Sequence, residues 1–147
     1  MQKKTITDAQ TTASSSWNSA HGPSNARLHF RSGHGKTGAW SARTNDKNQW
    51  LQVDLGKKLE VTAIQTQGRY DANQWVMSYT VSYSNDGKTF HPYQNHKVFQ
   101  ANRDRHTVVK NNLQPTIVAR YIRVHPKTWY SHISMRMELL GCPFGKY

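Results

Sequence analysis

The chain has 147 residues and a mass of 16.9 kDa, which is the size of one ordinary domain. Twenty Lys and Arg against eight Asp and Glu give a net charge of +12, and the mean hydropathy is −0.85, so a thin core lies under a basic surface. No run of about 18 apolar residues exists, which excludes a transmembrane helix. The charge favours acidic glycans, anionic lipid headgroups or nucleic acid as partners, and a basic solvated surface without a dedicated ligand is the alternative.

Apolar and polar residues alternate through most of the chain, which is the pattern of β-strands with one buried face. In chain order we expect strands at 50–55, 61–66, 78–84, about 89–90, 121–125 and 133–140. The first two are joined across Gly56-Lys57-Lys58, and Asn85-Asp86-Gly87-Lys88 is a tight-turn signal. The last strand carries its apolar face on Ile133, Met135, Met137 and Leu139.

Helical signals are weak in this sequence. No segment places apolar residues at helical spacing over three turns, and we expect the five prolines to fall between strands. There is no internal repeat, low-complexity tract or linker composition. Short strands separated by turns therefore predict a single all-β domain over residues 1–147, built as an antiparallel sandwich or barrel.

Three segments look like neither strands nor minimal turns. They are residues 14–23, 31–38 and 68–74, which are rich in Gly, Ser, Asn and His and also carry aromatic and cationic side chains. Binding residues on a β-scaffold tend to lie in such loops, because the sheets hold them at fixed positions. We therefore expect the ligand site in these segments.

Several motifs in a fixed order carry a resemblance to a known family. They are Trp50-Leu51-Gln52-Val53-Asp54-Leu55-Gly56, Tyr83-Ser84-x-Asp86-Gly87, Ala119-Arg120-Tyr121-Ile122-Arg123 and the stretch from Ile133 to Cys142. Over about residues 6–142 the sequence resembles the discoidin domain family, also called the coagulation factor 5/8 type C domain. The resemblance implies an antiparallel jelly-roll β-sandwich of the galactose-binding-domain type, with a ligand site in the loops at one end.

The resemblance also implies a function. Members of that family are expected outside cells or at the cell surface as recognition and adhesion modules, and they are not enzymes. The leading interpretation is a module that binds a galactose-type carbohydrate. The first alternative is a binder of anionic surfaces, meaning heparin-like glycans or phosphatidylserine membranes with peripheral membrane contact. The second alternative is a protein-binding module for collagen or a receptor.

The candidate ligand residues combine an aromatic face for the C–H side of a sugar with planar polar groups for its hydroxyls. They are Trp17, His21, Asn45, Arg69, Tyr70, Asp71 and Asn73. Packing is an equal alternative for Trp17, and an ion pair within the loop is an equal alternative for Arg69. Trp40, Trp50, Trp75 and Trp129 lie in the family motifs, and we expect them to pack in the core.

Two basic clusters are candidates for an anionic partner. Arg103 and Arg105 form one, and Lys57 and Lys58 form the other. Arginine pairs with sulfate or phosphate through two bonds at once, which suits heparin-like chains. A solvated face is the simpler account of any one of these residues. The usual nucleic-acid motifs are absent, so we expect no specific nucleic-acid partner.

Catalytic and metal-binding patterns are missing from the sequence. There is no His-Glu-x-x-His, Gly-x-Ser-x-Gly or phosphate-binding glycine loop, so we expect no enzyme activity and no catalytic residue. We predict no cofactor and no metal site, and a structural calcium ion is left open. Cys142 is the only cysteine, whereas family members commonly pair it with one before the first strand, so here the fold depends on packing. The oligomeric state is also left open.

Overall fold

The computed structural model describes residues 10–143, and side chains up to residue 141. Its elements are β1 (Thr11–Ala13), two 3-10 turns η2 (Ser19–His21) and η3 (Pro23–Ala26), β2 (Trp40–Ser41), β3 (Leu51–Gln67), β4 (Trp75–Ser84), β5 (His91–Pro92), β6 (Phe99–Gln100), β7 (Val109–Tyr130) and β8 (Ser134–Pro143). No α-helix occurs between residues 10 and 143, and neither helical turn there is long and apolar enough to cross a membrane.

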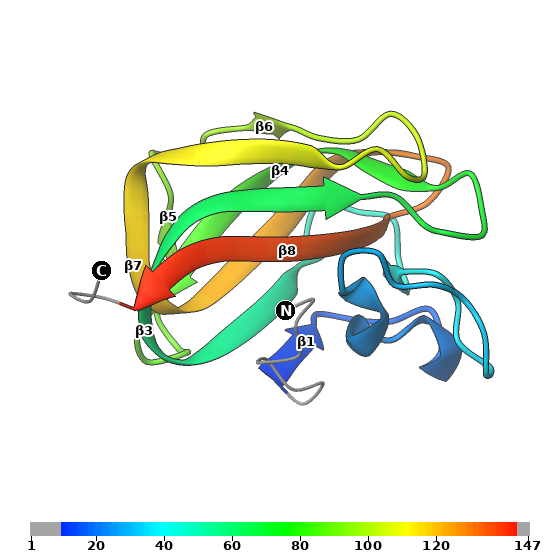
Figure 1. The fold of residues 1–147 in the computed structure, drawn as a ribbon, viewed down its shortest axis with the longest axis horizontal. Coiled ribbons are helices and arrows are strands. Elements are labelled where there is room, and N and C mark those ends of the chain that lie inside the picture. The colour runs from blue at the N-terminus through cyan, green and yellow to red at the C-terminus, as the bar shows by residue number, and fades with distance from the viewer. Residues whose placement is uncertain (1–9, 144–147) are drawn as a thin grey trace.

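Two long bent strands, β3 and β7, build both layers of the fold. The first half of β3 pairs with β1 and with residues 121–124 of β7, and its second half pairs with β8 and with residues 109–119 of β7. A register shift between Asp54 and Leu59 separates the halves of β3. Figure 1 shows both strands turning back at the same end of the molecule. All pairs between named strands are antiparallel, so the predicted antiparallel all-β class is confirmed.

Three local expectations about the strands were wrong. The strands expected at 50–55 and 61–66 are one continuous β3, because its bulge at residues 54–59 bends the strand without ending it. The strand expected at 89–90 lies at β5, two residues later. Four of the five prolines lie within strands rather than between them. Pro92 is tolerated because its strand, β5, lies at the edge of the sheet, and Pro126 is tolerated because it lies next to a register shift.

The core lies between the two layers. Ile133, Met135 and Met137 are fully buried and Leu139 packs against them, as the alternation in the last strand predicts. They meet apolar residues of the other strands, namely Leu51, Val53, Ile64, Val76, Tyr79 and Ile122. Trp40 is also fully buried, which confirms its expected packing role.

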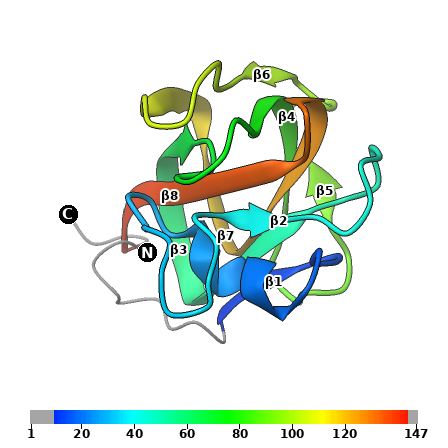
Figure 2. The same cartoon turned by 90° about the vertical axis from the view of Figure 1, so that its right-hand side faces the viewer.

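The irregular segments gather at the end opposite the bends of β3 and β7. Residues 14–38, 68–74, 101–108 and 131–133 lie there together, and we call this the loop end (Figure 2). The Thr37 amide donates to the Ala20 carbonyl oxygen and the Tyr70 amide to the Gly38 carbonyl oxygen, both at 2.9 Å. These bonds hold the three predicted binding segments in contact with one another.

Gly38 sets how closely two of these segments approach. A Cβ atom on Gly38 would lie 2.3 Å from Tyr70 Cβ and 2.8 Å from the Tyr70 amide nitrogen, so no side chain fits without separating the segments. At Gly22 the nearest atom to such a Cβ is 3.8 Å away, and its φ is −70°.

We therefore predict that Gly38→Ala lowers the free energy of unfolding by about 1–3 kcal/mol, because the close contact forces a backbone shift. Gly22→Ala is the matched control and should change stability by less than about 1 kcal/mol. Urea unfolding followed by tryptophan fluorescence measures both. Equal stability of the two variants would contradict the close-approach role of Gly38.

Candidate functional site

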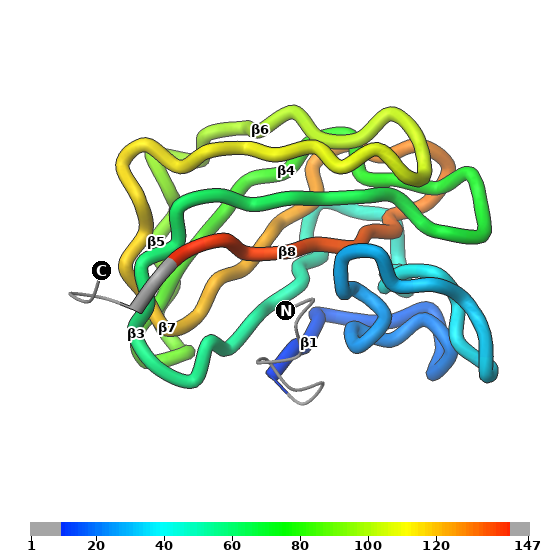
Figure 3. The backbone as a smooth tube through the Cα atoms, viewed as in Figure 1, coloured from blue at the N-terminus to red at the C-terminus, as the bar shows by residue number. Residues whose placement is uncertain are grey.

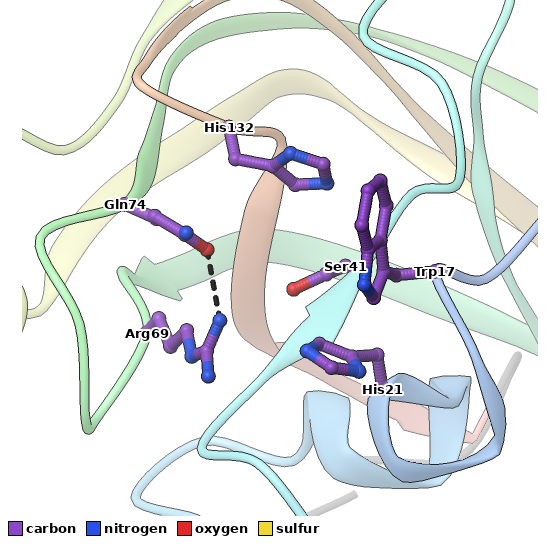
Figure 4. A pocket seen from close by; sticks show the side chains of 6 residues that line it. All are labelled: Trp17, His21, Ser41, Arg69, Gln74 and His132. Carbon is purple, nitrogen blue, oxygen red and sulfur yellow. Dashed lines mark hydrogen bonds between the residues drawn. The ribbon is translucent and has the colours of Figure 1, made fainter.

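A pocket of about 210 Å³ opens at the loop end (Figure 4). Its lining side chains come from four separate parts of the chain and are those of Trp17, His21, Ser41, Arg69, Gln74 and His132. Figure 4 shows Arg69 and Gln74 facing Trp17 across the opening. We call it the tryptophan pocket.

Trp17 forms the aromatic wall of this pocket. Its side chain is 55% exposed, although the Trp17 amide is fixed by a 2.9 Å bond to the Ser41 carbonyl oxygen. The indole meets the His132 ring edge-on, with centroids 5.4 Å apart and planes at 88°. The exposed ring beside polar side chains makes Trp17 the candidate aromatic contact for a ligand.

Hydrogen bonds orient the His132 ring that contacts Trp17. Its Nε2 lies 2.7 Å from the Ala42 carbonyl oxygen, which can only accept, so Nε2 carries the proton. Nδ1 then accepts from Asn45 Nδ2 at 3.1 Å, while Asn45 Oδ1 accepts from the Ile133 amide at 2.9 Å. Asn45 therefore orients His132 and contributes no free group of its own to the pocket.

Arg69 faces Trp17 and is held by two neighbours in the same loop. Its Nε donates to Asp71 Oδ1 at 2.7 Å and its Nη1 donates to Gln74 Oε1 at 3.1 Å. The Gly38 amide also donates to Asp71 Oδ1, at 3.1 Å. Burial raises the pKa of Asp71, but the hydrogen bonds from Arg69 and Gly38 outweigh it and hold that pKa below 3.8. Arg69 Nη2 makes no hydrogen bond within residues 10–143, so it can donate to a ligand.

The pocket floor is a chain of hydrogen bonds with a fixed direction. Ser134 Oγ donates to Gln74 Oε1 at 2.8 Å, so its single proton is used there. The 2.7 Å contact between Ser41 Oγ and Ser134 Oγ must then be donated by Ser41. Ser41 Oγ keeps its lone pairs for a ligand, and Gln74 Nε2 makes no hydrogen bond in the described part of the chain. The floor thus offers one acceptor and one donor.

His21 adds a second acceptor. Asn18 Oδ1 accepts from the Ala20 amide at 2.9 Å and lies 2.6 Å from His21 Nδ1, so Nδ1 donates and Nε2 carries a lone pair. Burial, then the charge of Arg69, lowers the pKa of His21 from its usual 6.5. The imidazole is therefore neutral at physiological pH, with Nε2 able to accept from a hydroxyl group.

The predicted ligand residues separate into three groups. Trp17, His21 and Arg69 line the tryptophan pocket, and Asn45 and Asp71 hold its members in place. Tyr70 and Asn73 lie outside it: Asn73 Oδ1 accepts from Arg105 Nε at 2.8 Å, and Tyr70 lines a second cavity.

Sequence reasoning missed Ser41, Gln74 and His132 as pocket residues. Gln74 could have been included, because it ends the irregular segment 68–74. His132 lies directly before a predicted strand, and Ser41 lies next to a core tryptophan, where nothing in the pattern marks a binding role.

The second cavity lies on the other side of the 68–74 segment. Its volume is about 430 Å³, and it is lined by His29, Arg31, Gln67, Tyr70, His106 and Arg136. Tyr70 meets His106 edge-on at a centroid distance of 5.3 Å. The guanidinium carbons of Arg31 and Arg136 lie 5.9 and 5.8 Å from the centre of the Tyr70 ring. We call it the arginine cavity.

Arg136 is a cation with 1% of its surface exposed. Its guanidinium donates to the carbonyl oxygens of Gly68 at 2.7 Å, of Phe30 at 2.8 Å and of Arg105 at 2.8 Å. Burial lowers the pKa of Arg136 to about 10, so the charge persists at neutral pH. Its three hydrogen-bonded oxygens are all uncharged carbonyls, and the cavity therefore has a positive floor.

The four predicted basic residues do not form one patch. Arg103 is exposed and Arg105 half-buried, and both lie at the loop end between β6 and β7. Lys57 and Lys58 lie in the bulge of β3. Thr66 of β3, which pairs with Val109 of β7, is eight residues from Lys58, or about 27 Å of extended strand. The two clusters therefore lie at opposite ends of the molecule.

Metal ligands do not gather in the described part of the chain. Within residues 10–143, no group of three or more His, Cys, Asp or Glu side chains is placed to hold a metal ion. The segment before residue 10, where the missing partner cysteine was considered, lies outside the described residues, as does the side chain of Cys142. The expectation of no cofactor and no metal site therefore stays a prediction, and a structural calcium ion stays open.

The chain belongs to the F5/8 type C domain family, because a profile of that family matches residues 10–139. It is 44% identical over 150 residues to coagulation factor VIII of Canis lupus familiaris, which covers 97% of this chain and 6% of that protein. It is also 44% identical over 153 residues to lactadherin of Rattus norvegicus, covering 97% of this chain and 35% of that protein.

A solved structure shows the same fold. Wild-type discoidin II from Dictyostelium discoideum matches with a TM-score of 0.87 and 36% identity, over 93% of this chain and 56% of that one. The predicted family and the discoidin-type β-sandwich are therefore confirmed. The chain spans less than two thirds of each of these three relatives.

Proposed function

We propose that this domain is a non-catalytic recognition and adhesion module that works outside cells and binds a galactose-type carbohydrate in the tryptophan pocket. The observation that carries the proposal is the exposed Trp17 ring opposite polar groups whose hydrogen-bonding directions are fixed by their neighbours. Fixed groups lose little conformational freedom on binding, which is how a small polar ligand gains affinity.

The chemistry of the pocket matches a neutral sugar. One face of a galactose ring is a patch of C–H groups that can stack on the Trp17 indole. Its hydroxyls both donate and accept, and the pocket offers Arg69 Nη2 and Gln74 Nε2 as donors and His21 Nε2 and Ser41 Oγ as acceptors. Two donors, two acceptors and one aromatic face suit a hydroxyl-rich ring better than a purely apolar or purely anionic group.

The same hydrogen bonds support a binding role rather than catalysis. Ser41 donates to Ser134 and has no imidazole partner among the hydrogen bonds of the described residues, while His21 Nδ1 is tied to Asn18. A nucleophile hydrogen-bonded to a general base is the arrangement that acyl or glycosyl transfer through a serine would need.

Truncation of Trp17 tests the stacking. We predict that Trp17→Ala weakens binding of galactose at least about tenfold, because it removes the aromatic face. The melting temperature should stay nearly unchanged, because the side chain is 55% exposed. Val98→Ala removes a side chain of a residue that is 51% exposed elsewhere and serves as the matched control. Calorimetric titration measures binding, and unchanged affinity of Trp17→Ala would contradict the proposed pocket.

The pH dependence tests the acceptor role of His21. Because the pKa of His21 is lowered from 6.5, the acceptor at Nε2 is present at neutral pH and is lost as pH falls through that lowered pKa. Galactose affinity should therefore be flat above about pH 7 and decline in acid. His21→Gln, whose amide oxygen can accept at any pH, should remove the decline. Persistence of the same decline in His21→Gln would assign it to another group.

A second candidate function rests on the arginine cavity. We propose that its floor, formed by Arg136 and flanked by Arg31, binds the anionic headgroup of a membrane lipid such as phosphatidylserine. The exposed Trp17 ring lies at the same end of the molecule and could enter the interface beside the headgroups. The hydrogen bonding of the buried Arg136 to neutral carbonyl oxygens is the specific observation that favours this candidate.

Vesicles of two compositions test the second candidate. Phosphatidylserine vesicles should bind the domain and phosphatidylcholine vesicles should not, and added salt should weaken the binding because the attraction is electrostatic. Arg31→Gln should reduce the affinity about tenfold by removing a charge beside the headgroup. Lys57→Gln, which removes an equal charge at the opposite end, is the control. Co-sedimentation measures binding, and equal losses in the two variants would indicate attraction by net charge alone.

A further inference from the structure

A third cavity lies on the outer face of the β4–β7 pair, away from the core. Its volume is about 240 Å³, and its lining includes Ser82, Phe90, His96, His125 and Lys127. Ile122 and Val124 of β7 point into the core, so the alternating residues at 123, 125 and 127 lie on the opposite face. We call this the sheet-face cavity.

Arginine, histidine and lysine side chains follow one another along this face of β7. Arg123, His125 and Lys127 are spaced by two residues, which is about 7 Å between neighbours on an extended strand. His125 Nε2 lies 2.7 Å from Ser82 Oγ on β4. Burial, then the charges of Lys127, Arg123 and His96, lower the pKa of His125 to about 4. Every charged group that acts on this imidazole is therefore a cation.

Arg123 is held rigidly beside the cavity. Its guanidinium carbon lies 3.9 Å from the centre of the Trp50 indole and 3.8 Å from the centre of the Phe90 ring, so the group is stacked between two aromatic faces. Its Nε donates to Gln52 Oε1 at 2.8 Å. Phe90 also lines the cavity, and the stack therefore fixes both a charge and an apolar wall.

The loop that places His96 at the cavity is strained. Gln94, Asn95 and His96 have φ values of 45°, 54° and 64°, which are three successive left-handed residues, none of them glycine. Each costs roughly 1–2 kcal/mol relative to ordinary backbone. The loop is tied down by Tyr93 Oη, which donates to the Pro115 carbonyl oxygen at 2.6 Å, and by Gln94 Nε2, which donates to the Gln114 carbonyl oxygen at 2.6 Å. Such strain is typical of segments that hold a binding group in position.

We propose that the sheet-face cavity is a second ligand site, which binds an oxyanion group, namely the sulfate of a sulfated saccharide. Lys127 supplies the charge and the His96 imidazole an N–H donor, and the hydrogen-bonded pair of Ser82 and His125 keeps one further donor for the ligand. Phe90 and Pro92 form an apolar side against which the sugar ring that carries the sulfate can pack. The site is independent of the tryptophan pocket, which lies at the loop end on other residues.

The test follows the His125 imidazole by NMR in sulfate and in chloride at equal ionic strength. A bound anion favours the imidazolium form, so sulfate should raise the pKa of His125 by about one unit relative to chloride. A sulfated disaccharide should produce the same rise at lower concentration than inorganic sulfate, and its unsulfated counterpart should produce none.

Variants separate a binding site from a general charge effect. Lys127→Ala should reduce the sulfate affinity about tenfold, because it removes the full charge at the cavity. It should also raise the pKa of His125 in chloride, because the lysine disfavours the imidazolium. Lys110→Ala removes an equal charge from an exposed position in the other half of β7 and should change neither quantity. Trp17→Ala should leave the sulfate response intact, so failure here and failure of the tryptophan pocket are distinguishable.

Three results would overturn the proposal. Equal pKa values of His125 in sulfate and chloride would exclude an anion site. Equal effects of Lys127→Ala and Lys110→Ala, with both variants folded by circular dichroism, would reduce the response to net charge. A response to inorganic sulfate without one to the sulfated disaccharide would mean an adventitious ion only.

Discussion

The geometry of the loop end depends on the hydrogen bonds of one buried cation. Arg136 on β8 donates to the backbone of three segments that are far apart in the sequence, at Phe30, Gly68 and Arg105. A guanidinium presents its donors in a rigid plane, so one side chain fixes the positions of three loops relative to the sheet. Loops without regular secondary structure otherwise have few backbone partners, and this hub supplies them. Together with the backbone bonds from Thr37 to Ala20 and from Tyr70 to Gly38, these bonds hold the walls of the two loop-end cavities.

Both cavities share a single wall, which is the segment 68–74. Consecutive residues point to its two sides: Arg69 enters the tryptophan pocket, whereas Tyr70 lies over Arg136 in the arginine cavity. The side facing Trp17 presents directed donors and acceptors, and the other side presents an electrostatic field. One short loop thus divides the loop end into a part suited to a neutral hydroxylated ligand and a part suited to an anion. Because Arg69 and Tyr70 are adjacent in the chain, a shift of this segment would alter both parts together.

Local patterns predicted the elements of the fold better than the pocket. The alternation of Ile133, Met135 and Met137 correctly predicted a buried face, because side chains alternate strictly on a strand. Arg136 lies on the other face of this strand and is also buried, since the loops that cover β8 come from distant segments. Composition marked the segments 14–23 and 68–74 as candidates, and both contribute side chains to the tryptophan pocket. Ser41 and His132 could not, because their role comes from tertiary contacts that no local pattern records.

The contacts of the acidic side chains determine where the net charge of +12 is left without a neighbouring carboxylate. Asp86 and Asp104 accept backbone amides in turns, Asp54 pairs with Arg120, and Asp71 orients Arg69. These carboxylates are held in turns, strands and loops by their hydrogen bonds, and none of them is hydrogen-bonded to Arg136 or Lys127. A carboxylate placed beside either cation would have stabilised the free protein and competed with an anionic ligand. The proposed anion sites therefore lie at cavities where the cation has no carboxylate hydrogen-bonded to it among the described residues, so its local field is stronger than the average charge of the surface would suggest.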